Sequence, residues 1–139
     1  MQLQKAHNGG IHAVMNIPAD YTLQFDLTPG PSMVSGWSSI VHISATGNDC
    51  CAYGDRVPGI WFHPGNQMLH IRDGHADEGN AGCDPDTVMR PGTTYHIKVM
   101  MARTGVTITI NNQPEPSCTQ ARTSRSLWTP HTVCGRPVV

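Results

Sequence analysis

The 139-residue sequence has few charged side chains: lysine, arginine, aspartate and glutamate together make up 14% of it, and the formal net charge is −1. A nucleic-acid-binding protein needs a basic stripe to neutralise phosphates, so this balance argues against nucleic-acid binding. The same shortage of charge excludes a highly charged disordered tail. Apolar runs are also short, and none approaches the ~18 residues that cross a bilayer, so we expect no membrane span.

The first residues, Met1–Lys5, lack the apolar core of a secretory signal. Either a leader has been removed or left out, or the protein is cytosolic. The cysteines favour the first interpretation, and we predict an extracellular, secreted protein. No two cysteines have the CxxC spacing of a zinc ribbon or a thioredoxin-type redox motif.

Five cysteines are present: Cys50, Cys51, Cys83, Cys118 and Cys134. Two disulfides and one spare thiol fit this count, and the pairing we favour joins Cys50 or Cys51 to Cys83, and Cys118 to Cys134. A bond between the neighbours Cys50 and Cys51 is one alternative, and five buried free thiols in a reducing compartment are another. The odd cysteine leaves room for a bridge to another chain.

Period-two alternation of apolar and polar residues dominates the chain, and no long amphipathic helix is evident. The alternation is clearest at Tyr21–Leu27, Trp37–Ile43, Tyr95–Met101 and Val106–Ile110. The 14 glycines and 11 prolines place many turns between these short segments. Short antiparallel strands separated by turns predict an all-β fold, a two-sheet antiparallel β-sandwich or jelly roll.

The segment Gly59–Arg72 predicts a β-hairpin, with a Pro-Gly-Asn-Gln turn between two alternating runs. If His63 lies opposite Met68, alternation places four apolar residues on the core face: Ile60, Phe62, Leu69 and Ile71. The other face then carries Trp61, His63, Met68, His70 and Arg72.

This second face is suited to a sugar ring. The C–H face of a sugar stacks on an indole, and its hydroxyls bond to imidazole and guanidinium groups. We therefore predict a ligand-binding site at Trp61, His63, His70 and Arg72. The alternative is that Trp61 packs under a loop, or that these side chains form an ordinary cross-strand cluster.

Residues 73–92 show no regular pattern and are long for a loop in a compact domain, which indicates a functional loop or one held by cysteine or metal. Calcium takes six to eight oxygen ligands, and this loop predicts a calcium site at Asp73, Asp77, Glu78, Asp84 and Asp86. The spacing does not match an EF-hand, and a solvated acidic loop is the alternative. His63, His70 and His75 could converge on zinc, yet strand geometry favours separate surface roles.

Pro91–Val99 reads Pro-Gly-Thr-Thr-Tyr-His-Ile-Lys-Val, and Val106–Asn112 reads Val-Thr-Ile-Thr-Ile-Asn-Asn. Together they resemble the hairpin that marks the concanavalin A-like lectin/glucanase superfamily, which includes laminin-G-like and pentraxin-like domains. The resemblance covers roughly residues 10–112. It implies a concanavalin A-like jelly roll that often binds carbohydrate, sometimes with calcium.

Two features depart from this superfamily. The Glu-x-Asp-x-x-Glu strand of its family-16 type glycoside hydrolases is absent, as are a nucleophile elbow, an HExxH motif and a glycosidase-like carboxylate pair, so we predict that the protein is not an enzyme. Members usually end with a strand that returns beside the first one, and residues 118–139 offer no such strand. We predict a concanavalin A-like jelly-roll domain at 1–117 and an irregular C-terminal segment at 118–139, tied by a disulfide or used in assembly.

These patterns predict a non-catalytic extracellular module, lectin-like or adhesive, whose partners are glycans or other extracellular proteins. The alternative is a structural subunit of an extracellular filament, sheath or matrix. Such a subunit would self-assemble through open sheet edges and the C-terminal tail, because open edges pair with other chains.

Overall fold

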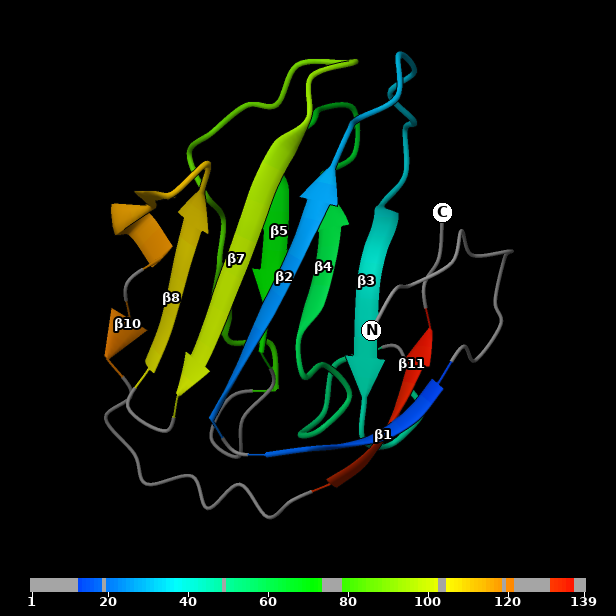
Figure 1. The fold of residues 1–139 in the computed structure, drawn as a ribbon. Coiled ribbons are helices and arrows are strands. Elements are labelled where there is room, and N and C mark those ends of the chain that lie inside the picture. The colour runs from blue at the N-terminus through cyan, green and yellow to red at the C-terminus, as the bar shows by residue number, and fades with distance from the viewer. Residues whose placement is uncertain are drawn as a thin grey trace.

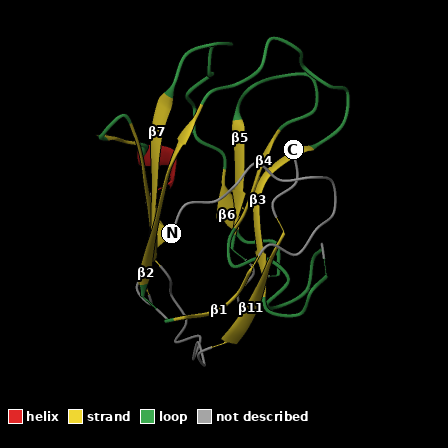
Figure 2. Ribbon diagram, turned by 45° about the vertical axis from the view of Figure 1, so that its right-hand side comes forward, coloured by secondary structure: helices red, strands yellow, loops and turns green. Residues whose placement is uncertain are grey.

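The computed structural model of the chain describes residues 13–18, 20–48, 50–73, 79–102, 105–118, 120–121 and 131–136. Strands make up almost all of the described elements, and they form two antiparallel sheets that face each other (Figure 1, Figure 2). The two-sheet antiparallel β-sandwich predicted from the alternating pattern is confirmed. Among the described residues there is no helix long and apolar enough to cross a membrane.

The first sheet has six strands, in the order β1 (Ala13–Ile17), β11 (His131–Arg136), β3 (Ser38–Ser44), β4 (Gly59–Phe62), β5 (Leu69–Arg72) and β6 (Gly82–Cys83). The second sheet has the order β10 (Gln120–Ala121), β8 (Gly105–Ile110), β7 (Tyr95–Ala102) and β2 (Tyr21–Leu27), with β9 (Gln113–Pro114) pairing beside β8. A short 3-10 helix, η1, spans Pro116–Cys118.

The core lies between the two sheets, and alternation decides which side chains enter it. Along β7 every second residue is buried, beginning at Tyr95, while the residues between them are half-buried. The buried side chains of β7 and β8 cluster with those of the β4–β5 hairpin, where Ile60, Leu69 and Ile71 are at most 1% exposed. Burying each such side chain contributes roughly 1.5–3 kcal/mol.

The hairpin has the predicted register. Trp61 lies opposite His70, Gly59 lies opposite Arg72, and the His63 amide donates to the Met68 carbonyl at 3.1 Å. The apolar face predicted for this hairpin therefore packs into the core, with Phe62 partly buried beside it.

The C-terminal part of the chain is more regular than predicted. Strand β11 lies between β1 and β3 and is antiparallel to both, and β10 extends the second sheet. The prediction that residues 118–139 offer no closing strand is therefore wrong. The segment His-Thr-Val-Cys-Gly-Arg contains glycine and arginine and lacks a clean apolar alternation, and its neighbours on both sides satisfy its backbone groups instead.

The predicted disulfide pairing is also wrong. Cys83 is bonded to Cys118, which joins β6 to η1, and Cys50 is bonded to its neighbour Cys51. The Cα atoms of Cys83 and Cys118 are 5.2 Å apart, a normal disulfide spacing, because β6 and η1 are neighbours at one side of the core. The side chain of Cys134 lies outside the described part of the chain.

Candidate ligand-binding site

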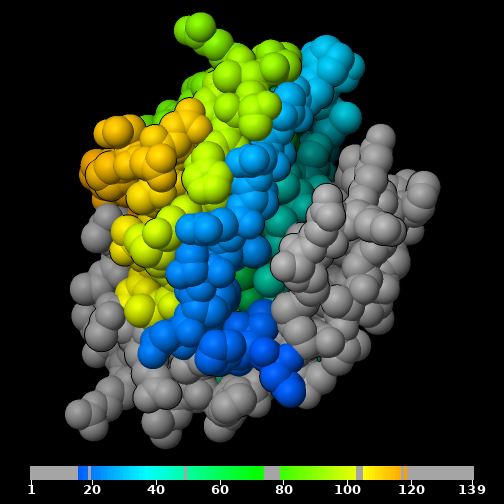
Figure 3. Space-filling model, viewed as in Figure 1, coloured from blue at the N-terminus to red at the C-terminus, as the bar shows by residue number. Residues whose placement is uncertain are grey.

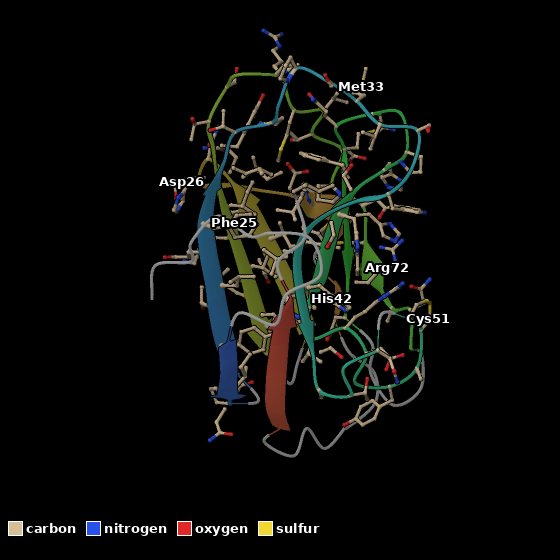
Figure 4. The ribbon with its side chains drawn as sticks, turned by 90° about the vertical axis from the view of Figure 1, so that its right-hand side faces the viewer. Phe25, Asp26, Met33, His42, Cys51 and Arg72 are labelled. Carbon is tan, nitrogen blue, oxygen red and sulfur yellow. A yellow bond between two sulfur atoms is a disulfide. The ribbon has the colours of Figure 1, made fainter. Side chains whose placement is uncertain are left out.

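The outer face of the first sheet, which points away from the second sheet, carries the polar side of the β4–β5 hairpin. Figure 4 shows Arg72 on this outer side, whereas Phe25 of β2 points into the sandwich and Asp26 points away from it on the opposite side. His63, His70 and Trp61 share the outer side of the hairpin with Arg72 because alternate residues of a strand point the same way.

Asp84, which directly follows the edge strand β6, contacts three of the polar side chains of this face. Its Oδ1 accepts a hydrogen bond from Nη1 of Arg72 at 3.0 Å and lies 2.8 Å from Nδ1 of His70. Its Oδ2 lies 3.3 Å from Nε2 of His63. We name these four residues, His63, His70, Arg72 and Asp84, the Asp84 cluster.

Strand β6 brings Asp84 to this position. Cys83 pairs with Ile71 and Gly82 pairs with Arg72, so the residue that follows comes to lie beside His70. Gly82 has a φ of 156°, and a Cβ at this position would overlap the Ile71 carbonyl oxygen and the Cα of Arg72. Only glycine therefore allows β6 to approach β5 this closely.

The charges in the cluster follow from its burial and its contacts. Burial lowers the pKa of His70 below its ordinary value, with a further contribution from the Arg72 charge, and Asp84 acts in the opposite direction. Burial acts to raise the pKa of Asp84, but the hydrogen bond and charge of Arg72 and the contact with His70 outweigh it, so that pKa is lowered. At neutral pH Asp84 is thus a carboxylate and His70 is neutral. Because a carboxylate only accepts, Nδ1 of His70 donates to it.

Trp37 covers two members of the cluster. Its ring centroid lies 4.9 Å from that of His63 and 4.5 Å from that of His70, and the side chain is nevertheless 53% exposed. The loop before it is fastened to the hairpin turn: the Gly65 amide donates to the Val34 carbonyl, and Nε2 of the buried Gln67 donates to the Gly30 carbonyl, both at 2.8 Å. These bonds hold the exposed indole over the imidazoles.

Trp61, predicted as the sugar-binding indole, is in a different setting. It is half-buried, and the guanidinium carbon of Arg56 lies 4.8 Å from its ring centroid. A Cβ at position 59 would overlap its ring, so the six-membered ring of the indole lies against Gly59 of β4. Arg56 also donates to the side-chain oxygen of Asn80. Trp61 thus contacts Arg56 of a loop on one side and Gly59 of the sheet on the other, and its part in ligand binding stays a prediction.

The acidic residues predicted as calcium ligands do not meet in one group among the described residues. Asp73 is buried, Asp86 is exposed and Asp84 belongs to its own cluster, while Asp77 and Glu78 lie outside the described residues. Calcium binding by this loop stays a prediction.

The expectation that the histidines have separate roles is wrong for His63 and His70, whose ring centroids are 4.9 Å apart. His75 lies outside the described residues.

A groove of about 530 Å³ lies between the loop after β2 and the β4–β5 hairpin turn. The exposed apolar side chains of Met33 and Val34 line it together with Phe62, His63 and Asn66. His63 thus borders both the groove and the Asp84 cluster.

Two features of this site were not predicted. Trp37 was not expected to contact the histidines, and Asp84 was expected as a calcium ligand and not as the partner of His63, His70 and Arg72. A signal for Trp37 exists in the register: Ser38 of β3 pairs with Phe62 of β4, so the residue before Ser38 falls beside His63. Recognising that β3 and β4 are neighbours would have placed the indole. Asp84 depends on the glycine-mediated approach of a two-residue strand, for which sequence patterns provide no signal.

The fold and the site define a two-sheet antiparallel β-sandwich whose first sheet carries an aromatic and charged outer face. No protein-family model and no curated protein matches this sequence. Among solved structures, Trypanosoma rangeli sialidase in complex with sialic acid is similar, with a TM-score of 0.53 and 17% sequence identity. The match covers 85% of this chain and 17% of that protein, and at this identity it shows a shared fold alone.

Proposed function

We propose that this chain is a non-catalytic, lectin-like module that binds a glycan on the outer face of its first sheet. Trp37 is the observation that carries the proposal. Its indole is 53% exposed, it is held on one side by His63 and His70, and the Asp84–Arg72 ion pair lies beside those rings. An exposed indole fixed in this way presents a flat apolar surface to solvent.

A sugar ring has an apolar C–H face and polar hydroxyl groups, and this site offers contacts for both. The C–H groups on one face of a pyranose bury apolar area against an indole, and the hydroxyls at its rim need donors and acceptors close by. Imidazole, carboxylate and guanidinium groups supply both, and here they are already ordered by contacts with one another. Such prior ordering lowers the entropy cost of binding.

The composition of the cluster supports binding rather than hydrolysis. Glycoside hydrolysis generally uses two carboxylates on either side of the scissile bond. The Asp84 cluster contains one carboxylate, and both of its oxygens have histidine or arginine partners.

The Cys83–Cys118 bond supports an extracellular location. Disulfides persist in oxidising compartments and are rare in the cytosol. We propose that the module is secreted and meets glycans, or other extracellular proteins that carry them, outside the cell.

A glycan array tests this function with the wild-type chain, Trp37→Ala and a control, Met100→Ala. Met100 is half-buried on the outer face of the other sheet, so its truncation removes apolar surface of a similar kind far from the site. We expect the wild type and the control to bind the same glycans, and Trp37→Ala to lose at least about tenfold in affinity, since ~1.4 kcal/mol of stacking corresponds to that factor. Binding of no glycan by the wild type would remove the proposal.

A second candidate function is a subunit of an extracellular assembly, and one observation favours it. Strand β2 ends the second sheet, and its seven residues have a partner strand, β7, on one side in the described structure. Figure 3 shows β2 in blue along the surface beside β7. Open edges of this length can pair with another chain. Sedimentation of the purified protein tests this candidate, and a monomer at all concentrations counts against it.

A further inference from the structure

We propose that His63, His70 and Asp84 form a zinc-binding site on the outer face of the first sheet. The inference goes beyond glycan binding and does not rest on it. The three side chains each offer one ligand atom, and these atoms all lie within 4.8 Å of one another. They come from separate places in the sequence, directly after β4, within β5 and directly after β6, and the sheet brings them together.

The distances suit a small tetrahedral ion. Zinc lies about 2.0–2.1 Å from imidazole nitrogen and about 2.0–2.2 Å from carboxylate oxygen, so two ligand atoms at a tetrahedral angle are about 3.3 Å apart. Nε2 of His63 and Oδ2 of Asp84 are 3.3 Å apart. Nδ1 of His70 lies 2.8 Å from Oδ1 of the same carboxylate, and it becomes a ligand for the ion when the ring proton moves from Nδ1 to Nε2.

The ligand set selects the class of metal. Two imidazoles and one carboxylate suit zinc and related transition metals, whereas calcium and magnesium prefer oxygen ligands alone. Three protein ligands leave the fourth position of a tetrahedral ion for a water molecule or another ligand. The side chains of His63 and Asp84 are 25% and 38% exposed, which gives an ion access from solvent.

Neighbouring residues hold the three ligands in place, as residues around metal sites commonly do. Trp37 lies against both imidazoles, with ring centroids 4.9 Å from His63 and 4.5 Å from His70. Arg72 donates to Oδ1 of Asp84 and leaves Oδ2 for the ion. Arg72 also donates to the Ile71 carbonyl at 2.9 Å, which fixes the guanidinium at the backbone of β5.

Titration calorimetry with Zn²⁺ alone, in the absence of any glycan, tests the site in the full chain. We expect one zinc ion per chain, and we expect His63→Ala, His70→Ala and Asp84→Asn each to weaken binding by about tenfold or more, because each removes one of three ligands. Replacing Zn²⁺ with Co²⁺ should produce visible absorption in the wild type that these variants lose.

His96→Ala is the matched control. Nδ1 of His96 lies 2.9 Å from Oδ1 of Asp26 on the outer face of the other sheet, and this histidine–aspartate pair has no third ligand among the described residues. We expect zinc affinity to be unchanged in this variant.

If a variant does not fold, ¹⁵N NMR of the histidine rings in the wild-type protein identifies the zinc ligands without any substitution. Zinc should shift the ring nitrogens of His63 and His70 and leave those of His96 unchanged. Absence of zinc binding, retention of wild-type affinity in a folded His70→Ala chain, or shifts confined to other histidines would each overturn the proposal. A zinc result of either kind is independent of the glycan array, so the two proposals can fail separately.

Discussion

At the scale of single residues, Asp55 shows how polar side chains position the hairpin that carries the site. It is 1% exposed, and its carboxylate accepts hydrogen bonds from the Thr46 hydroxyl and, at 2.8 Å, from the Ala52 amide. Its backbone carbonyl lies 2.8 Å from Nε2 of the buried His42, which donates to it. The loop before β4 is therefore fastened to β3 from within.

The same contacts make Asp55 sensitive to acid. The Thr46 hydroxyl, followed by the Ala52 amide, lowers the pKa of Asp55 below its ordinary value of 3.8, against the opposing effect of burial. Because the folded-state pKa is depressed, the carboxylate contributes its full stability above pH 3.8. That contribution is lost as the pH falls through the folded-state pKa.

We predict that Asp55→Asn lowers the free energy of unfolding at neutral pH by about 1–3 kcal/mol, because the new amide N–H₂ faces a donor, the Thr46 hydroxyl or the Ala52 amide, from which a carboxylate oxygen accepted a hydrogen bond. The difference from wild type should shrink as the pH falls below 3.8. Urea unfolding across this pH range measures both effects.

Asp26→Asn is the control, since its side chain is 70% exposed and such a surface change has an effect within about 0.5 kcal/mol. An Asp55→Asn effect equal to that of the control would contradict the role assigned to the buried carboxylate.

Residue identities on the hairpin face could be predicted from the sequence because alternation decides them. Ile60, Leu69 and Ile71 are buried, and His63 and His70 lie on the other face, as period-two patterning predicts. The choice of indole could not be predicted, because Trp37 and Trp61 differ only in what covers them. Arg56 lies over Trp61, whereas Trp37 is 53% exposed.

At the scale of secondary-structure elements, the shortest strand carries much of the site. Strand β6 has two residues, yet it places Asp84 against β5 and connects through Cys83 to η1. Cys118 is fully buried and Cys83 is 8% exposed, so the bond lies at the border of the core. Long alternating strands are visible in a sequence, whereas a two-residue strand held by a disulfide leaves no periodic signal.

We predict that replacing both Cys83 and Cys118 by alanine lowers the free energy of unfolding by about 3–4 kcal/mol, as expected for a bond that closes a loop of this length. The same double variant should bind zinc more weakly, because β6 then holds Asp84 less firmly. Urea unfolding and zinc titration measure the two effects.

Replacing Cys50 and Cys51 by alanine is the control for this experiment. Their sequence separation is 1, compared with 35 for the other pair, so their bond constrains the unfolded chain far less. Peptide mapping without reduction checks the pairing directly. Recovery of Cys83 bonded to any cysteine other than Cys118 would contradict the arrangement.

Strand β11 shows the limit of sequence patterns at this scale. Its residues do not alternate strongly, and not all of them have high β-propensity. The strand forms because its backbone pairs with β1 on one side and with β3 on the other. Pairing between segments more than 80 residues apart is a tertiary effect that a local pattern does not register.

At the scale of the whole molecule, the two sheets share one core but have different outer faces. Their inner faces form one core, and this architecture could be predicted from alternation and turn residues. Their outer faces differ: the first carries the Asp84 cluster and Trp37, and the second carries the isolated His96–Asp26 pair among its described ion pairs. We therefore propose that ligands bind on one face of the sandwich, the outer face of the first sheet.

The most direct test of that assignment is an NMR titration of the ¹⁵N-labelled protein with a glycan selected on the array. We predict shifts of the Trp37 indole N–H and of the amides of His63 and His70, with little change at His96 and Met100 on the other sheet. Shifts at the second sheet alone, or at the groove around Met33 and Val34 without any at Trp37, would contradict binding on the outer face of the first sheet.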